Sequence, residues 1–254
     1  MTRKISAFGT LLGTDVDPTA DYLPINDASV ADALKNKRIL INELRKSIGP
    51  DDLHPPSTSL FSYTANGTGV TQSQTYNALR GLSAKRTDAG TASADRVGFI
   101  GKAVPGSTPW TATAKIEIAP TLSTEFHRIG IAIHESATGK VIYVGHNTQG
   151  SANGVKLTCY YYSSLTAFGS APGSFDKLYT LQNPPQWFRI SYDGTTYTFS
   201  ISFDDGVTFT SVATATSASF FTADKIGVAM ATFGAITTVP MALVRYWDDP
   251  DFAY

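Results

Sequence analysis

From residue 59 onward, apolar and polar residues alternate along most of the chain with a period of two. This period is typical of β-strands that have one face against a core and the other towards solvent. Gly, Pro, Asn or Asp interrupts the alternation roughly every 8 to 12 residues, as in an all-β sandwich. The clearest predicted strands are 111–118, 128–134, 140–144, 187–192, 197–203, 207–209, 225–232 and 241–247.

Short turns connect several of these strands. The turn at 137–139, which contains Gly139, separates two strands that are therefore predicted to form a hairpin. Asp-Gly pairs at 193–194 and 205–206 join the next three strands. These three are predicted to form an antiparallel meander.

The first fifty residues lack this period and contain two helix signals, at 30–34 and 42–48. Asn42 is a suitable N-cap and Gly49 a suitable C-cap for the second helix. Prolines at 50, 55 and 56 then oppose both helix and central strand. The predicted organisation is a module at 1–49, a hinge-like linker at 50–57 and a sandwich at 58–254.

The composition restricts the classes of partner. Charged residues make up 16% of the chain and the formal net charge is −1, so no strong field draws it to nucleic acid or to anionic lipid. No apolar run reaches the roughly 20 residues that span a bilayer, and the N-terminus lacks the apolar region of a signal peptide. The single Cys159 excludes an internal disulfide framework and is expected to be buried. We expect a protein made in a cytoplasm, with neither nucleic acid nor membrane as a partner.

The stretches 5–15, 21–27 and 37–45 resemble, in this order, a module found at the start of tail and head-fibre proteins of tailed phages. In that module a Leu-Pro-Ile-x-Asp-like strand, here from Leu23, pairs with a Lys-x-Ile-x-x-x-Glu-Leu-like strand, here from Lys37, that runs into a short helix. The resemblance implies a virion protein made in the host cytoplasm. It also implies contact with capsid, tail or baseplate proteins, and a homo-oligomer, most often a trimer.

The module carries more apolar side chains than about fifty residues can bury alone. We therefore expect these side chains to attach the subunit to its neighbours or to the particle. The predicted attachment residues are Leu11, Leu12, Leu23, Ile25, Ile39, Ile41 and Leu44.

The second half of the chain, roughly 100–247, resembles the concanavalin-like jelly-roll domains of carbohydrate-binding modules and of many phage tail proteins. The matching pieces are 110–116, 129–134, 187–202, 204–209 and 226–230. They are mostly signatures of a fold, so they imply architecture more strongly than activity. The predicted fold class is mainly β, an antiparallel jelly-roll sandwich preceded by a small strand and helix module.

The candidate ligand-binding residues are Tyr160, Tyr161, Tyr162, Asp204 and Asp205. On a strand Tyr161 faces away from the other two tyrosines, so one set should be partly exposed. Tyrosine suits the C–H faces of sugars or a protein interface, and the alternative is an edge of the core or a subunit contact. The two aspartates could supply calcium ligands, but a hairpin turn is the favoured interpretation, and a solvated tail is favoured for the acidic cluster at 248–251. No metal and no cofactor are expected.

No arrangement of residues predicts catalysis. A glycosidase needs paired carboxylates, whereas Glu117, Glu125 and Glu135 are isolated along the sequence. Thr138 stands where a zinc protease motif beginning at His134 needs its second histidine, and no Gly-x-Ser-x-Gly elbow is present. We expect no catalytic residues and a protein that is not an enzyme.

Three functions follow from these observations. The leading one is a structural virion protein of a tailed phage, a fibre, tail or capsid decoration that displays a lectin-like sandwich. The second is a glycan-binding protein of the phage tail that recognises a host surface glycan. The third, which the residues favour least, is a glycoside hydrolase.

Overall fold

The computed structural model describes residues 22–26, 36–40, 54–77, 80–88, 95–118, 126–148, 155–170, 176–179, 184–216, 222–234 and 240–251. Contacts divide the chain into two compact units, Met1–Asp51 with Ala253–Tyr254, and Asp52–Phe252. None of the described residues belongs to a helix long and apolar enough to cross a membrane. The helices predicted at 30–34 and 42–48 lie outside the described residues.

The first unit contains a pair of antiparallel strands, β1 (Tyr22–Asn26) and β2 (Asn36–Leu40). In their register Leu23 lies opposite Ile39. These are the two short stretches whose pairing the resemblance to fibre modules implied. A third predicted attachment residue, Ile25, also lies on β1. The remaining four lie outside the described residues: Leu11, Leu12, Ile41 and Leu44.

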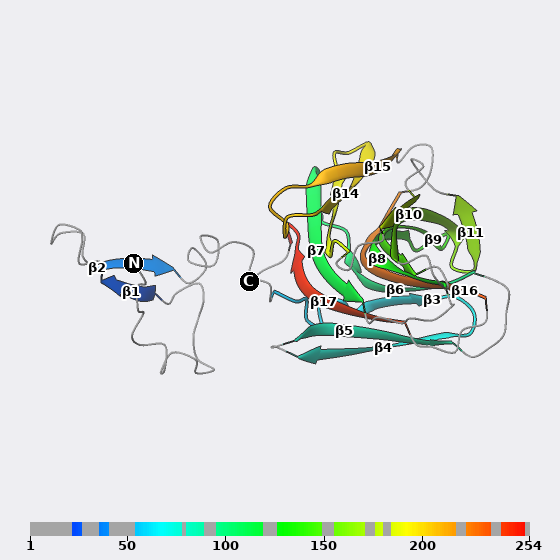
Figure 1. The fold of residues 1–254 in the computed structure, drawn as a ribbon, viewed down its shortest axis with the longest axis horizontal. Helices are drawn as coiled ribbons and strands as arrows, with labels where there is room; N and C mark the ends of the chain where they lie inside the picture. The colour runs from blue at the N-terminus through cyan, green and yellow to red at the C-terminus, as the bar shows by residue number, and fades with distance from the viewer. Residues whose placement is uncertain are drawn as a thin grey trace. The chain divides into compact units, whose positions relative to one another are not determined.

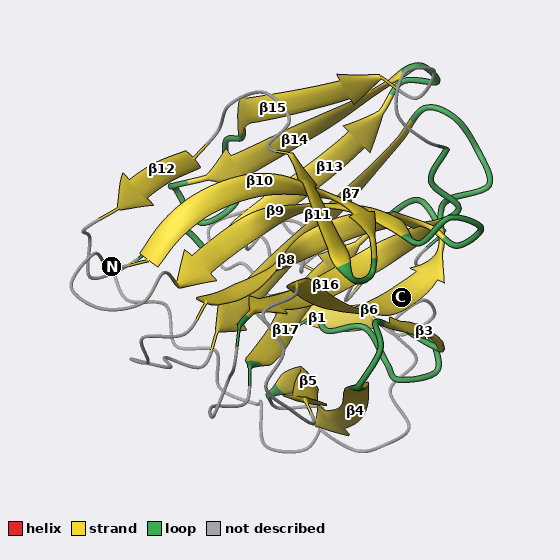
Figure 2. Ribbon diagram, turned by 90° about the vertical axis from the view of Figure 1, so that its right-hand side faces the viewer, coloured by secondary structure: helices red, strands yellow, loops and turns green. Residues whose placement is uncertain are grey.

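The second unit is a sandwich of two antiparallel sheets (Figures 1 and 2). The sheet of eight strands has the order β11-β10-β9-β8-β16-β6-β3, with β12 also paired to β10. Its strands are β3 (Tyr63–Asn66), β6 (Asp95–Ala103), β8 (Phe126–Glu135), β9 (Lys140–Thr148), β10 (Val155–Ser164), β11 (Ala167–Ser170), β12 (Asp176–Tyr179) and β16 (Lys225–Phe233).

The other sheet has seven strands in the order β15-β14-β13-β7-β17-β5-β4. Neighbours in both sheets come from distant parts of the chain, as in a jelly roll, so the predicted fold class is confirmed. Its strands are β4 (Val70–Asn77), β5 (Gly81–Asp88), β7 (Trp110–Ile118), β13 (Trp187–Tyr192), β14 (Thr196–Ser202), β15 (Thr210–Thr216) and β17 (Met241–Asp248).

The predicted hairpin and meander are present, with one correction. β8 pairs with β9 and β13 with β14, each antiparallel, as the turn signals indicated. The strand predicted at 207–209 is wrong, because β14 ends at Ser202 and β15 begins only at Thr210. Asp205 adopts a positive φ of 54° in the connecting turn, which side-chain hydrogen bonds to Asp204 hold together. Phe203, the last residue of the strand predicted at 197–203, lies beyond the end of β14 and is 57% exposed.

The main core lies between the two sheets. Every second residue of the central strands points into it, including Ile129, Ile131 and Ile133 of β8 and Ala112, Ala114 and Ile116 of β7. Cys159 is fully buried there, as predicted. Among the described residues, the largest fully buried side chain is Trp247, whose ring meets that of Phe61 edge-on at 4.8 Å between centroids.

A second apolar cluster lies on the other face of the eight-stranded sheet. Its buried members are Val97, Phe99, Ala132, Val141, Tyr143, Tyr162, Ala229 and Ala231. This face is closed off because the β10–β11 connection reaches across to β6, where the Val97 amide donates to the Leu165 carbonyl at 2.8 Å. The sheet is therefore curled (Figure 1), and its inner curve holds the small core formed by these residues.

Two cross-strand pairs of glycines lie in this curled sheet. Gly130 of β8 is opposite Gly145 of β9, and Gly101 of β6 is opposite Gly227 of β16. A Cβ built on Gly145 would lie 2.2 Å from the carbonyl oxygen of Ile129. The other three glycines would meet backbone oxygens at 2.0 to 2.1 Å. The curvature of the sheet thus depends on residues without side chains at these positions.

The sandwich begins inside the predicted linker. The His54 amide donates to the Arg245 carbonyl, and the Trp247 amide donates to the His54 carbonyl, both at 2.8 Å. Pro56 is buried. Backbone bonds to β17 therefore hold residues from His54 onward, so the sandwich starts at His54 instead of residue 58. The remaining part of the linker predicted at 50–57, residues 50–53, lies outside the described residues.

Candidate ligand-binding site

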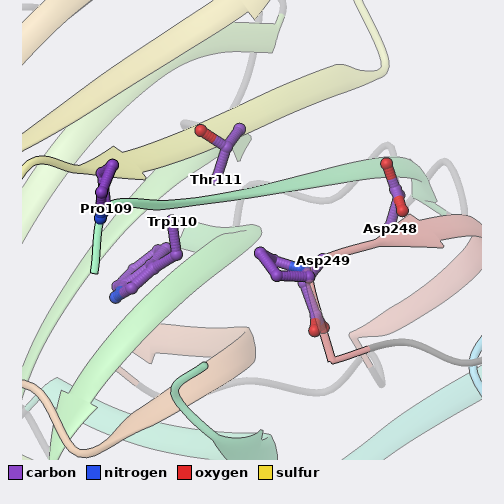
Figure 3. A pocket seen from close by; sticks show the side chains of 6 residues that line it. Pro109, Trp110, Thr111, Asp248 and Asp249 are labelled. Atoms are coloured by element: carbon purple, nitrogen blue, oxygen red, sulfur yellow. The ribbon is translucent and has the colours of Figure 1, made fainter. Parts of the chain in front are cut away.

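A shallow cavity of about 330 Å³, widely open to solvent, lies where β7 begins and β17 ends (Figure 3). The first two residues of β7, an aromatic and a hydroxyl residue, line one part of it, and the last residue of β17 and the residue after it, both aspartates, line another. Cavities of this size fall at the lower end of the range for small-molecule sites. The lining residues are Pro109, Trp110, Thr111, Asp248, Asp249 and Pro250.

Asp249 forms the rigid wall of the cavity. Its side chain is fully buried, and both carboxylate oxygens accept hydrogen bonds from Lys102 Nζ, at 2.8 and 3.0 Å. The Trp247 indole donates to Oδ2 at 2.5 Å and the Asp251 amide to Oδ1 at 2.9 Å. The predicted solvated tail is therefore wrong for Asp249, because the partly buried Lys102 and two further donors satisfy its charge inside the sandwich.

Trp110 and Thr111 are placed by pairing with β13. Trp110 is opposite Tyr192, and the two ring centroids are 5.8 Å apart. Tyr197 packs against both rings, so only 4% of Trp110 is exposed. The Thr111 hydroxyl donates to Ser191 Oγ at 3.0 Å. The Trp110 side chain is thus almost wholly packed in the main core, and Thr111 contributes a hydroxyl oxygen to the cavity.

We expect Asp249→Asn to lower the free energy of unfolding by about 2 kcal/mol. Asparagine has only one acceptor oxygen. Its NH2 group would therefore point at N–H donors from which a carboxylate oxygen now accepts hydrogen bonds. Urea unfolding of the two proteins measures the difference. Asp251→Asn is the matched control, since Asp251 is exposed and is expected to change stability little. Equal stability of both variants would contradict a structural role for Asp249.

The tyrosine run has two different environments. Tyr161 packs against the main core, whereas Tyr160 and Tyr162 face the curled side of the sheet, so the predicted alternation is present. Tyr162 is fully buried, and burial raises the pKa of its hydroxyl, which accepts a hydrogen bond from Arg128 Nη1 at 2.8 Å. Tyr160 is half-buried, with the Arg128 guanidinium 5.0 Å from its ring centre. Ligand binding by these tyrosines stays a prediction.

Arg128 organises this aromatic group. Its Nη1 also donates to Asp95 Oδ1 at 2.7 Å, and its guanidinium lies 5.4 Å from the Phe168 ring centre. An arginine that is paired with a carboxylate and surrounded by ring faces is well suited to holding a curled sheet together. The described contacts of Tyr162 are thus those of a packed interior.

Asp204 and Asp205 shape the turn between β14 and β15. Asp204 accepts hydrogen bonds from the Thr208 hydroxyl at 2.6 Å, the Thr208 amide at 2.8 Å and the Ser202 hydroxyl at 2.7 Å. These bonds, those from Thr208 first, lower the pKa of Asp204 to about 2. Within the described ranges, no group of three or more His, Cys, Asp or Glu side chains is placed to hold a metal ion. The carboxylate of Asp204 is therefore engaged by its own turn.

The sequence did not indicate the cavity as a site. Its residues come from two segments about 140 positions apart, 109–111 and 248–250. Their only local signal is that each segment combines a proline with polar residues next to an apolar strand. The candidate residues from the sequence, at 160–162 and 204–205, do not line it.

Comparisons with known proteins identify no family. No family model matches the chain, and no curated protein matches it. Solved structures with similar folds include a functionally unknown protein from Saccharomyces cerevisiae, 16% identical over 74% of this chain and 98% of that one, with a TM-score of 0.49. Another is the exoplasmic/lumenal domain of VIP36 in its Ca2+/Man3GlcNAc-bound form, 9% identical over 80% of this chain and 89% of that one, with a TM-score of 0.44.

A third is xylan beta-1,4-xylosidase from Bacillus halodurans, 12% identical over 66% of this chain, with a TM-score of 0.43. The match spans about a third of that enzyme, 32% of its length. The architecture described above follows from the strand pairing of this chain, and the cavity from its own lining residues.

Proposed function

We propose that this chain is a non-enzymatic structural protein of a tailed-phage virion, a fibre, tail or capsid decoration. In this proposal its first unit attaches the subunit to the particle, and its sandwich is displayed outward. The observation that carries the proposal is the antiparallel pairing of β1 with β2, in which Leu23 lies opposite Ile39. It joins the two stretches that resemble the strands of phage fibre modules. The β-sandwich that follows supplies a stable display domain.

The experiment compares the full chain with a protein that begins at Asp52. The shortened protein keeps His54, whose backbone bonds to Arg245 and Trp247 belong to the sandwich. We expect it to unfold cooperatively like the full chain, because the main core is intact. We also expect it to lose binding to particles made without the protein, and to sediment as a monomer where the full chain sediments as a homo-oligomer, most simply a trimer.

A point variant makes the same test within the full chain. Leu23→Asp places a charge on β1 and is expected to weaken particle binding strongly, since burial of one such side chain contributes on the order of 1.5 to 3 kcal/mol per subunit. Tyr76→Asp is the control, because Tyr76 is 44% exposed on edge strand β4 of the sandwich. If the shortened protein still decorates particles as an oligomer, the assignment of attachment to residues 1–51 is wrong.

The cavity beside Trp110 favours a second function for the same protein, recognition of a host surface glycan. The prolines and oxygen acceptors that line this small cavity are groups that can bind sugar C–H faces and hydroxyls. Binding of the full chain to a panel of bacterial surface polysaccharides tests this function. Hydrolysis is the least supported alternative, because one of the two carboxylates of the cavity, Asp249, is held by Lys102.

A further inference from the structure

Tyr63 connects the edge strand β3 to the interior of the eight-stranded sheet. It lies opposite Gly101 of β6, and Gly101 lies opposite Gly227 of β16. Since these glycines carry no side chains, the Tyr63 side chain can extend across both strands. Its hydroxyl shares a hydrogen bond of 3.3 Å with Nδ1 of His134 on β8. The contact therefore joins two strands that β6 and β16 separate in the sheet order.

The surroundings of His134 favour its neutral form. Only 1% of the residue is exposed, and its ring centre lies 5.1 Å from that of Phe99 and 5.8 Å from that of Tyr63. Its Nε2 is buried and has no hydrogen-bond partner. Burial, with a smaller contribution from Lys225 directly opposite on β16, lowers the pKa of His134 to about 4. A charged imidazole would be buried here beside an ammonium group.

Two carboxylates lie near His134, and both are engaged by other donors. Asp224 accepts a hydrogen bond from Lys225 Nζ at 2.7 Å. Glu135 accepts one from the Thr222 amide at 3.0 Å. Their charges attract a proton to the His134 ring, but burial opposes it more strongly. The groups that face the ring therefore do not compensate a positive charge on it.

The rest of β3 is held weakly. The strand has four residues, two half-buried and two exposed, and among the described strands it pairs only with β6. From β4, Gln72 Nε2 donates to the Ala65 carbonyl at 3.2 Å. Phe61 and Val70 are buried on either side of the strand and fix the chain at both ends of 62–69. This segment can therefore leave the sheet as a loop while Phe61 stays in the main core.

We propose that Tyr63 and His134 form an acid-sensitive switch, in which protonation of His134 breaks its contact with Tyr63 and releases β3 while the two-sheet sandwich stays folded. Release uncovers the backbone groups of β6 with which β3 now pairs. The closed form is fully favoured above about pH 6.5, and it is lost as the pH falls towards 4. The switch requires neither particle attachment nor glycan recognition.

Hydrogen exchange of the full chain at pH 7 and pH 4.5 tests the switch, with each rate corrected for the intrinsic effect of pH. The His134 ring titrates near its ordinary pKa of about 6.5 in the open form and at about 4 in the closed form, so the open population should rise about fiftyfold. The β3 amides that bond to β6 should lose protection by this factor. Their exchange should not depend on urea below the unfolding transition, because a local opening exposes little surface.

His134→Gln should abolish the acid response of β3, because a glutamine amide can keep a hydrogen bond to Tyr63 and does not titrate. His146→Gln is the matched control at the other histidine whose pKa burial lowers to about 4, and it should leave the response of β3 unchanged. The switch is wrong if His134→Gln still loses protection fiftyfold. It is also wrong if the β3 amides of the parent protein exchange with the same urea dependence as those of β7 and β13, a result that decides even where His134→Gln does not fold.

Discussion

Gly145→Ala is expected to lower the free energy of unfolding by about 3 kcal/mol, a large effect for one methyl group. The new Cβ would lie 2.2 Å from the Ile129 carbonyl oxygen and 2.4 Å from the Gly130 Cα, so backbone atoms of β8 would have to move. A displaced backbone also disturbs the ladder that β8 forms with β9. Flexible side chains can yield to a methyl group at little cost, but two paired strands cannot.

The matched control is Gly106→Ala. No atom lies within 4 Å of the Cβ that would be added at Gly106, and its φ is not positive, so stability should change by less than about 0.5 kcal/mol. Urea unfolding with a common slope compares both variants with the parent protein. Equal midpoints for Gly145→Ala and Gly106→Ala would show that the sheet does not need the close approach at Gly145.

Acidification from pH 7 to pH 4.5 is expected to destabilise the sandwich through two buried histidines. Burial lowers the pKa of His146 to about 4, and burial, with help from Lys225, lowers that of His134 to about 4. The unfolded chain binds these protons at its ordinary pKa near 6.5, so below that pH protons favour unfolding. Stability is complete above pH 6.5 and is lost as the pH falls towards 4, by on the order of 2 to 3 kcal/mol for each histidine.

His146→Gln separates the two contributions. The His146 Nε2 donates to the Pro185 carbonyl at 2.8 Å, and a glutamine amide offers a donor at the same position without a titrating ring. The variant is expected to lose about half as much stability as the parent protein between pH 7 and pH 4.5. Urea unfolding at a series of pH values measures the slope. An unchanged slope in the variant would mean that His146 does not remain neutral in the folded protein.

Contacts between residues far apart in the chain explain features that the alternation of apolar and polar residues could not predict. Arg86 is fully buried, although arginine is almost never so, and it donates to the carbonyls of Arg96 and Met230. The Met230 partner is 144 positions away. Strands β4 and β5 were not named from the sequence, because their polar residues lack a clear apolar face. These two strands, β4 at the edge of its sheet and β5 next to it, take their place from the strands they pair with.

The sequence by itself determined the fold class and most strands of the second half. The reason is local: a strand with one buried face needs alternating apolar and polar residues, and an Asp-Gly turn is marked by two adjacent residues. It also determined the burial of Cys159 and the alternate facing of Tyr161. The tertiary structure alone decided that the eight-stranded sheet curls around a second core, and that Asp249 is buried against Lys102. It alone brought Trp110 and Asp248 to one cavity. The physical reason is that these features depend on strand order, which joins segments far apart in the chain and leaves no periodic signal along it.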